Sequence, residues 1–197
     1  IKQKIAVSGK AGITPRISGE CVTGNGIGWD SDFVSVSDES KFRLQKNDIL
    51  ITSIGTGSAG RIDVYLDEFP SITDGEIIII RLKPQYDPFF IFAYLKTEYG
   101  KRQLSRMERG SSGQIHLYPD DIQKLLVPIP NKKQVIKKAV KTIEPAYMDI
   151  NNCKKAIRNA RLQISQILSP KEIADEYAKY DTIIPISEWR IKRPSKS

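Results

Sequence analysis

The segment Gly55–Gly60, GTGSAG, has the G-x-G-x-x-G spacing of a dinucleotide-binding loop and follows a strand-like segment. That chemistry requires a helix next, because the helix N-terminus receives the pyrophosphate. Here RIDVYL follows, with Ile62, Val64 and Leu66 alternating at the period of a strand. A Walker loop does not fit either, since Arg61 and Ile62 stand where lysine and Ser/Thr belong. The pattern therefore predicts a glycine-rich hairpin rather than a nucleotide site.

Two other short motifs suggest chemistry on DNA, and both are incomplete. DPFF, from Asp87 to Phe90, resembles the Asp-Pro-Pro-Tyr motif of DNA adenine methyltransferases but lacks the second proline. No glycine-rich strand-to-helix turn for S-adenosylmethionine is present in the sequence. YPDDIQK has the proline–aspartate pair of restriction nucleases without the acidic-x-Lys that should follow. We interpret Asp87 as a helix N-cap, and Asp120 and Asp121 as first-turn acids favoured by a helix dipole.

The single histidine, His116, offers the remaining candidate for catalysis. Ser111 or Ser112 could join it in a Ser-His-Asp set, but nothing in the sequence orients such a set. One histidine and two distant cysteines, Cys21 and Cys153, do not make a zinc site of any usual spacing. We therefore expect no catalytic residue and no metal site, and we expect His116 to be a hydrogen-bonding loop residue.

Positive charge is concentrated at the end of the chain. Residues 1–130 hold 16 basic and 16 acidic side chains, and residues 131–197 hold 15 basic against 7 acidic, so the whole net charge of +8 lies in the last third. Such an excess suits an acidic partner such as nucleic acid, and it also fits a solvated basic helix. Basic residues also cluster locally in the neutral part, at Lys2, Lys4, Lys10, Arg16, Lys96, Lys101, Arg102, Arg106 and Arg109.

The composition is that of a globular protein with a core, with 40% hydrophobic and 27% charged residues. The longest apolar run, in GEIIIIRL, is far too short to span a bilayer and predicts a buried strand. Two cysteines and no recognisable signal peptide indicate a reducing, cytoplasmic location.

The hydrophobic pattern predicts an α+β fold. Residues 1–81 are expected to form short strands joined by glycine turns, most clearly in NDILITSI and GEIIIIRL. At Asp87 the period changes, and Asp87 as N-cap with Pro88 at the first helical position predicts one helix over 87–107. A second short helix is expected over about 120–126.

From residue 131 a long helix is predicted, because apolar residues alternate at spacings of three and four over more than four heptads. The repeat includes Ile136, Ala139, Ile143, Ala146, Ile150, Cys153, Ile157, Ala160, Ile164 and Ile167. So narrow a stripe favours a coiled-coil partner, although a helix lying on its own domain stays open. Pro145 predicts a kink or break near Glu144. SPKE, from Ser169, should start a separate short helix.

Three segments occur in an order that resembles the specificity subunits of type I restriction–modification systems: ILITSIGTGSAGRI, AYLKTEYGKRQLSRMERGSSGQIHLYPDDIQKLLVPIP and KKQVIKKAVKTI. The resemblance covers residues 10–168. It is carried by a Gly-Ser-x-Gly turn, a Pro-x-Pro exit and the start of the long helix, at Gly110, Ser111, Gly113, Pro128, Ile129, Pro130, Gln134 and Ile136. It implies a β-rich target recognition domain at 1–130, a helical spacer and dimerisation region at 131–168, and a short helix with a basic tail at 169–197.

The resemblance implies sequence-specific recognition of double-stranded DNA, without catalysis in this chain. From charge and turn placement, we expect DNA contacts from Lys10, Arg16, Arg61, Arg106, Arg109, Ser111, Ser112, Gln114 and His116. The implied partners are a methyltransferase (modification) subunit and, as a further candidate, a restriction subunit. S-adenosylmethionine, ATP and magnesium are expected on those partners, and no cofactor in this chain.

Specificity subunits of this family have two recognition domains and two spacer helices, and this chain has room for one of each. It is therefore either a half-subunit that dimerises or the recognition region of a single-chain restriction–methylation enzyme. In both cases the family implies that the helix pairs antiparallel with a second copy, through a seam of Ile143, Ile150, Ile157 and Ile164. The alternative is a non-catalytic protein-interaction module that assembles a complex through this helix.

Overall fold

The computed structural model of the 197-residue chain describes residues 14–28, 33–34, 43–68, 71–110 and 114–167. Lys10, Ser111, Ser112 and the expected short helix and tail at 169–197 lie outside these residues. The chain divides into two compact units between Ala156 and Ile157.

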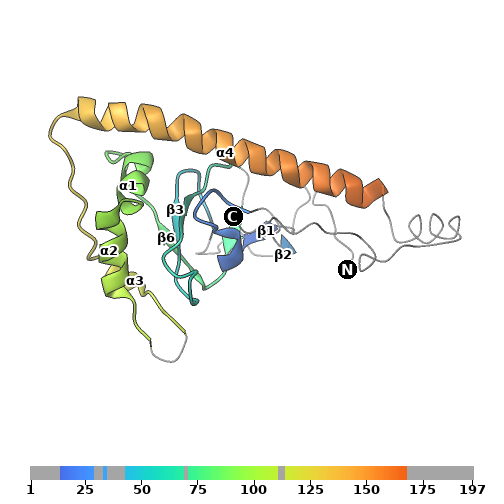
Figure 1. Cartoon of the computed structure of the whole chain (residues 1–197), viewed down its shortest axis with the longest axis horizontal. Coiled ribbons are helices and arrows are strands. Elements are labelled where there is room, and N and C mark those ends of the chain that lie inside the picture. Colours follow the sequence, from blue (N-terminus) through green and yellow to red (C-terminus); the bar gives the residue numbers. More distant parts are fainter. Residues whose placement is uncertain (1–13, 29–32, 35–42, 69–70, 111–113, 168–197) are drawn as a thin grey trace, which may run out of the picture. The chain divides into compact units, whose positions relative to one another are not determined.

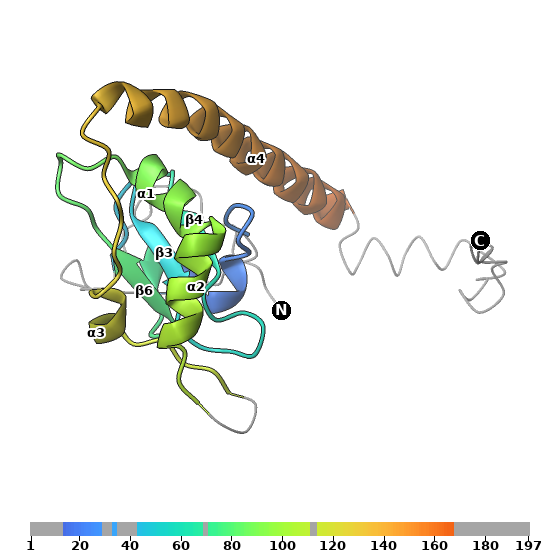
Figure 2. The same ribbon diagram turned by 60° about the vertical axis from the view of Figure 1, so that its left-hand side comes forward.

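The described residues of the first unit contain two three-stranded sheets (Figures 1 and 2). In one sheet, β1 (Thr14–Ile17) lies between β2 (Phe33–Val34) and β5 (Ile72–Thr73), antiparallel to β2 and parallel to β5. A single-turn 3₁₀ helix, η1 (Gly19–Cys21), follows β1. This sheet is short and joins segments that are far apart in the sequence.

The second sheet positions the candidate site. Its central strand β3 (Ile49–Thr52) lies between β4 (Ile62–Val64) and β6 (Ile77–Ile80) and is antiparallel to both. All three strands are rich in β-branched residues, which pack well on a pleated surface. The strands predicted in NDILITSI, RIDVYL and GEIIIIRL are therefore confirmed.

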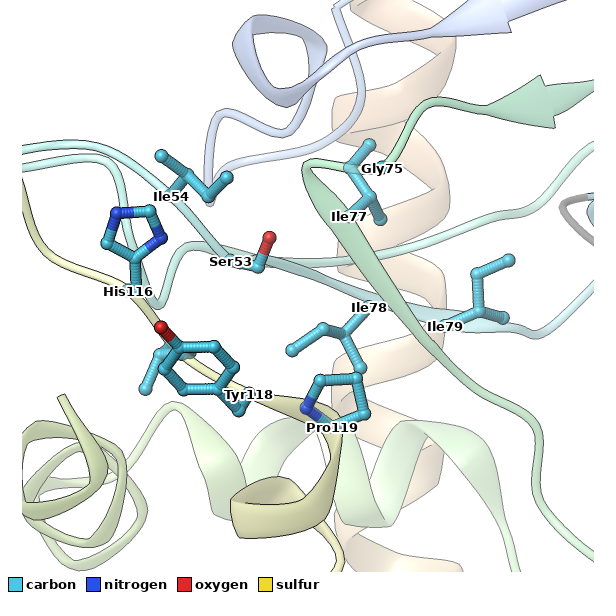
Figure 3. A pocket seen from close by; sticks show the side chains of 10 residues that line it. Ser53, Ile54, Gly75, Ile77, Ile78, Ile79, His116, Tyr118 and Pro119 are labelled. Carbon is cyan, nitrogen blue, oxygen red and sulfur yellow. The ribbon is translucent and has the colours of Figure 1, made fainter. Parts of the chain in front are cut away.

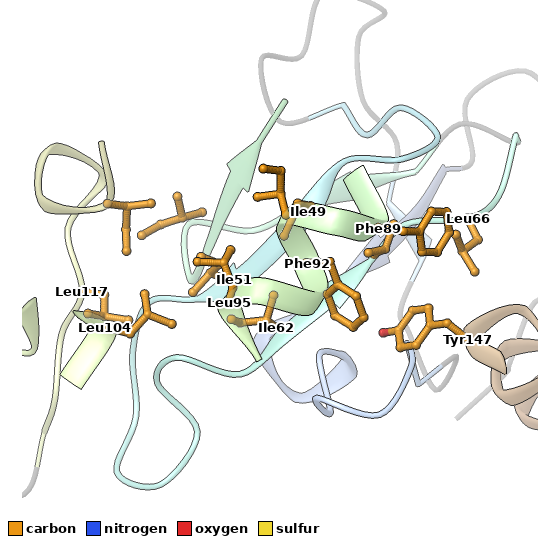
Figure 4. Packing of buried hydrophobic residues seen from close by; sticks show 14 residues of the cluster. Ile49, Ile51, Ile62, Leu66, Phe89, Phe92, Leu95, Leu104, Leu117 and Tyr147 are labelled. Atoms are coloured by element: carbon orange, nitrogen blue, oxygen red, sulfur yellow. The ribbon is translucent and has the colours of Figure 1, made fainter. Parts of the chain in front are cut away.

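Two separate hydrophobic clusters bury the two faces of the second sheet, because successive side chains along a strand point to opposite faces. Ile49 and Ile51 of β3 lie in the cluster that we call the first core. Leu50, between them, lies with Ile17 in the second core. Figure 4 shows the first core, in which Phe92 packs near these strands.

The helix α1 (Pro88–Leu95) begins as the sequence predicts, and α3 (Pro119–Ile122) begins close to the expected start but ends before the expected residue 126. Each has proline in its first turn. Asp87 Oδ1 accepts hydrogen bonds from the backbone N–H groups of Phe89 at 2.9 Å and Phe90 at 3.1 Å, which confirms the predicted N-cap. Four of the eight residues of α1 are buried, and they pack into the first core.

The single helix predicted over 87–107 is wrong, because α1 stops at Leu95 and a second helix, α2 (Glu98–Met107), follows. Thr97 caps α2, since its Oγ1 accepts a hydrogen bond from Gly100 N–H at 3.3 Å. A Cβ on Gly100 would lie 2.5 Å from the Cα and the carbonyl oxygen of Leu95, so only glycine allows this close turn. Leu104 of α2 still faces the first core, and the apolar period therefore continues across the break.

The predicted long helix is confirmed as α4 (Lys133–Ile167). It runs continuously through Pro145, so the break expected near Glu144 does not occur. None of the described helices is both long and apolar enough to cross a bilayer.

Two faces of the first half of α4, about 100° apart around the helix axis, have different surroundings. One face packs on the domain: Val140 and Ile143 border the first core, and Tyr147 is buried in it. The other face carries Ala146 and Ile150, which are exposed, with 41% of Ile150 accessible. In the second unit, Ile157 and Ile164 are each 55% exposed. The prediction that Ile143 belongs to the seam is therefore wrong, because Ile143 packs against the first core of its own domain. The other predicted seam residues, Ile150, Ile157 and Ile164, are exposed.

Candidate nucleic-acid interface

The turn between β3 and β4 is the glycine-rich hairpin predicted from GTGSAG. Gly60 N–H donates to Thr52 O at 2.8 Å, and the N–H groups of Ser58 and Ala59 donate to Gly55 O at 3.2 and 2.9 Å. Gly55 has a φ of 120°, and a Cβ there would lie 2.1 Å from Ser58 Oγ, so this position requires glycine. Because a strand follows the turn, there is no helix N-terminus to receive a pyrophosphate, and the hairpin interpretation is confirmed.

A second turn, closed by Arg109 and His116, lies beside the first. The Arg109 N–H group donates to the His116 carbonyl at 2.9 Å, and the His116 N–H group donates to the Arg109 carbonyl at 2.8 Å. On the opposite edge, Gly55 N–H donates to Ile115 O at 3.1 Å. Residues 115–117 therefore join the two turns through backbone hydrogen bonds. We use the name paired turns for residues 53–61, 109–110 and 114–117.

Four predicted contact residues meet at the paired turns: Arg61, Arg109, Gln114 and His116. Arg61 is exposed at the end of the first turn, where its Nη2 donates to Gly57 O at 3.1 Å. Gln114 is exposed and His116 is half-buried. The paired turns thus combine cationic and hydrogen-bonding side chains from segments about 50 residues apart in the chain.

The other predicted contacts are placed differently. Arg106 is exposed on the last turn of α2, three residues before Arg109. Arg16 lies in the other sheet, where it pairs with Ile72 and is half-buried. Among the residues that the structure describes, no group of three His, Cys, Asp or Glu side chains is arranged to hold a metal ion.

Arg109 is fixed by neighbours that the sequence did not reveal. Its Nη2 lies 2.5 Å from Asp121 Oδ2, in an ion pair without the alignment of a hydrogen bond. Lys124 Nζ donates to the other carboxylate oxygen at 2.9 Å. The hydrogen bond from Lys124 and the charge of Arg109 hold the pKa of Asp121 below its usual value. The expectation that Asp121 serves only a helix dipole is therefore incomplete.

A cleft of about 460 Å³ opens beside the paired turns (Figure 3). One wall is apolar and comes from Ile77 to Ile79 of β6. The other carries the rings of His116 and Tyr118, which lie nearly parallel with centroids 6.2 Å apart. The Tyr118 ring also lies 5.3 Å from the guanidinium carbon of Arg109.

A buried polar network docks α4 on the domain beside Asp63. The Asp63 carboxylate accepts hydrogen bonds from Gly24 N–H at 3.0 Å, from Gly26 N–H at 2.8 Å and from the Tyr147 hydroxyl. Burial, together with the Asp63 charge, raises the pKa of Tyr147 well above its usual value, so the hydroxyl stays a donor. Lys154 Nζ adds a bond to Gly26 O at 2.5 Å. Tyr147 and Lys154 are seven residues apart and therefore lie on one face of α4, but neither belongs to the predicted apolar repeat.

The sequence from residue 12 to residue 159 matches the family model of the type I restriction modification DNA specificity domain. The match begins just before β1, contains both of the paired turns and ends within α4. The chain belongs to this family. The resemblance expected from the order of the sequence motifs is therefore confirmed.

Solved structures share the α+β fold of this specificity domain. One is a chain from the study "Structural basis underlying complex assembly and conformational transition of the type I R-M system", with 14% identity and a TM-score of 0.52. Another is the HsdS subunit from Thermoanaerobacter tengcongensis, with 15% identity and a TM-score of 0.50. Both matches cover 88% of this chain and 45% of the solved chain, so this chain spans less than half of their length. None of the curated proteins matches the sequence.

Proposed function

We propose that this specificity domain binds double-stranded DNA and recognises its sequence through the paired turns. Family membership supports recognition of DNA, and the hydrogen-bonded pairing of the two turns is the observation that supports this location for the contact. The pairing brings the exposed cations Arg61 and Arg109 to the same hydrogen-bonded pair of turns, although 47 residues separate them in the chain. A surface of this kind can follow a phosphate backbone and present polar side chains to base edges.

The proposed contacts divide by chemistry. Arg61 and Arg106 would bind phosphates, because guanidinium groups match phosphate geometry. Arg109 would bind a phosphate and also donate to a neighbouring guanine edge. Gln114 and His116 would hydrogen-bond to base edges or position the turn. Lys10, Arg16, Ser111 and Ser112 remain candidates on the sequence argument alone.

We further propose that the domain directs a methyltransferase subunit, and in a larger complex a restriction subunit, to the recognised site in the cytoplasm. The similar solved chain from a study of type I R-M complex assembly supports such partners. Catalysis would then lie on those partners, with S-adenosylmethionine, ATP and magnesium bound there, and this chain would contribute recognition without catalysis.

The proposed assembly uses a second recognition half. This chain spans 45% of the solved chains that it resembles, which leaves room there for a second half of similar size. The exposed stripe of Ile150, Ile157 and Ile164 offers an apolar seam to an antiparallel partner helix, supplied by a second copy or by the rest of a longer chain.

A salt titration of duplex binding tests the proposal, with the site supplied as a palindrome. Each phosphate contact contributes roughly −0.9 to the slope of log K against log salt concentration, so three arginines predict a slope of about −3. Arg61→Ala should make the slope less steep by about 1. Lys46→Ala is the control, because Lys46 lies at the opposite end of β3 and pairs with Glu68 at 2.7 Å. A flat plot for the wild-type chain would contradict DNA recognition.

The second candidate function is a protein-interaction module that assembles through α4. The exposure of Ile157 and Ile164, both on one stripe of the helix, favours this alternative. A chain that self-associates or binds partner subunits, yet shifts no duplex at low salt, would support it over DNA recognition.

A further inference from the structure

Arg109 is constrained on two sides although most of its side chain is exposed. Asp121 holds Nη2 at 2.5 Å, and the guanidinium carbon lies 5.3 Å from the centre of the Tyr118 ring. The Arg109 side chain is nevertheless 62% exposed. The ion pair engages one of the three guanidinium nitrogens, so donors remain available on the open side.

Asp121 is the fixed end of this arrangement. Its side chain is 7% exposed, and it lies in α3, whose first turn is set by Pro119. Lys124 occupies Oδ1 at 2.9 Å, which leaves Oδ2 for Arg109. A buried, ionised carboxylate held in this way restricts the rotamers of an exposed arginine far more than solvent does.

We propose that Asp121 is a positioning residue for DNA recognition, which holds the Arg109 guanidinium against the Tyr118 ring so that its free N–H donors face the duplex. The inference rests on the proposed function and deepens it. A pre-ordered arginine loses less side-chain entropy on binding, and its planar fork matches a guanine edge or a phosphate in two hydrogen bonds. Asp121 itself need not touch DNA.

Whether replacement of Asp121 weakens or strengthens DNA binding distinguishes a positioning role from a purely electrostatic one. Asp121 is an acid on a surface offered to a polyanion, so by charge alone its removal should strengthen DNA binding. If Asp121 positions Arg109, its removal should instead weaken binding to the target sequence. Asp121→Asn is the suitable change, because the amide keeps the size and one acceptor oxygen and removes the charge.

The probe is a duplex selected by the wild-type chain from a pool with a randomised core, and a scrambled duplex of the same length is its reference. Asp121→Asn should lower affinity for the selected duplex about tenfold, as expected for one well-placed arginine contact, without lowering affinity for the scrambled duplex. Glu98→Gln is the matched control, since it removes an exposed ion pair to Arg102 at 2.9 Å on α2. The control should retain the wild-type preference.

A double-mutant comparison of Asp121 and Arg109 shows whether Asp121 acts through Arg109. In an Arg109→Ala background, Asp121→Asn should cause no further loss of affinity for the selected duplex. Arg109→Lys provides a second variant that keeps the charge and leaves α3 unchanged, and it should lose preference for the selected duplex while the salt slope stays the same.

Several outcomes would overturn the inference and leave the proposed function standing. They are wild-type or tighter binding of the selected duplex by Asp121→Asn, a full additional loss in the Arg109→Ala background, and a wild-type preference in Arg109→Lys. A wild-type chain that selects no duplex from the pool would instead contradict the proposed function itself.

Discussion

At the scale of single residues, Asp63 and Asp121 are both buried carboxylates, and the protein compensates them in different ways. Asp63 accepts hydrogen bonds from two backbone N–H groups and from the Tyr147 hydroxyl, whereas Asp121 is paired with two cations. Burial of an unpaired carboxylate is costly, so each acid requires its partners. Asp63 thereby ties α4 to the domain, and Asp121 ties Arg109 to α3.

Replacing Tyr147 by phenylalanine should destabilise the fold by about 1–3 kcal/mol, because Asp63 loses a buried hydrogen-bond donor. The ring remains, and with it the packing on Phe92 at a centroid distance of 4.6 Å, so the change isolates the hydroxyl. The free energy of unfolding in urea measures the effect. Tyr99→Phe is the control, since Tyr99 is 75% exposed and its replacement should be neutral. Equal unfolding energies for both variants would show that the hydroxyl does not hold α4.

At the scale of elements, the junction between α1 and α2 shows how one close contact sets a turn. Ordinarily, Gly→Ala within a helix stabilises by about 1 kcal/mol. At Gly100 the added Cβ would meet Leu95 at 2.5 Å, and relief of that overlap requires the two helices to separate. The contact should therefore reverse the usual sign of the substitution.

We predict that Gly100→Ala destabilises the chain by about 1–3 kcal/mol, the usual cost of overpacking. Gly75→Ala is a matched control, because nothing lies within 4 Å of a Cβ at that position. The control should be neutral or slightly stabilising, since alanine restricts the unfolded chain. Thermal unfolding of both variants measures the difference, and a stabilised Gly100→Ala would mean that the helices do not approach this closely.

The same elements show what the sequence could predict. The Asp87 cap and the glycine turn at Gly55 are encoded within a few neighbouring residues, and both are confirmed. The break after Leu95 was missed because the apolar period runs across it. The docking of Tyr147 on Asp63 joins residues 84 positions apart, and no local pattern contains such a contact. The α+β class was therefore accessible from the sequence, whereas the residues that join elements were not.

At the scale of the whole molecule, neighbouring faces of α4 have different environments, one buried and one exposed. The face with Tyr147 and Asn151 is buried against the domain. The stripe with Ile150 continues beyond the end of the first unit as Ile157 and Ile164, and all three remain exposed. Changes on this stripe should therefore alter assembly without unfolding the recognition domain.

The double replacement Ile157→Asp and Ile164→Asp should abolish pairing of α4 with a second helix. Both side chains are 55% exposed in the single chain, so aspartate costs little there, whereas an unpaired carboxylate buried in a helix seam costs several kcal/mol. Asn159→Asp is the control, since it adds charge on the side of the helix opposite the stripe. In sedimentation, the wild-type chain and the control should associate, and the double variant should be a monomer that binds a palindromic duplex no better than a single site.

If the wild-type chain is itself monomeric at every concentration, the homodimer is excluded. If, in addition, wild type and double variant bind methyltransferase subunits and palindromic duplexes equally well, α4 is not an assembly spacer and serves only the domain on which Tyr147 docks it.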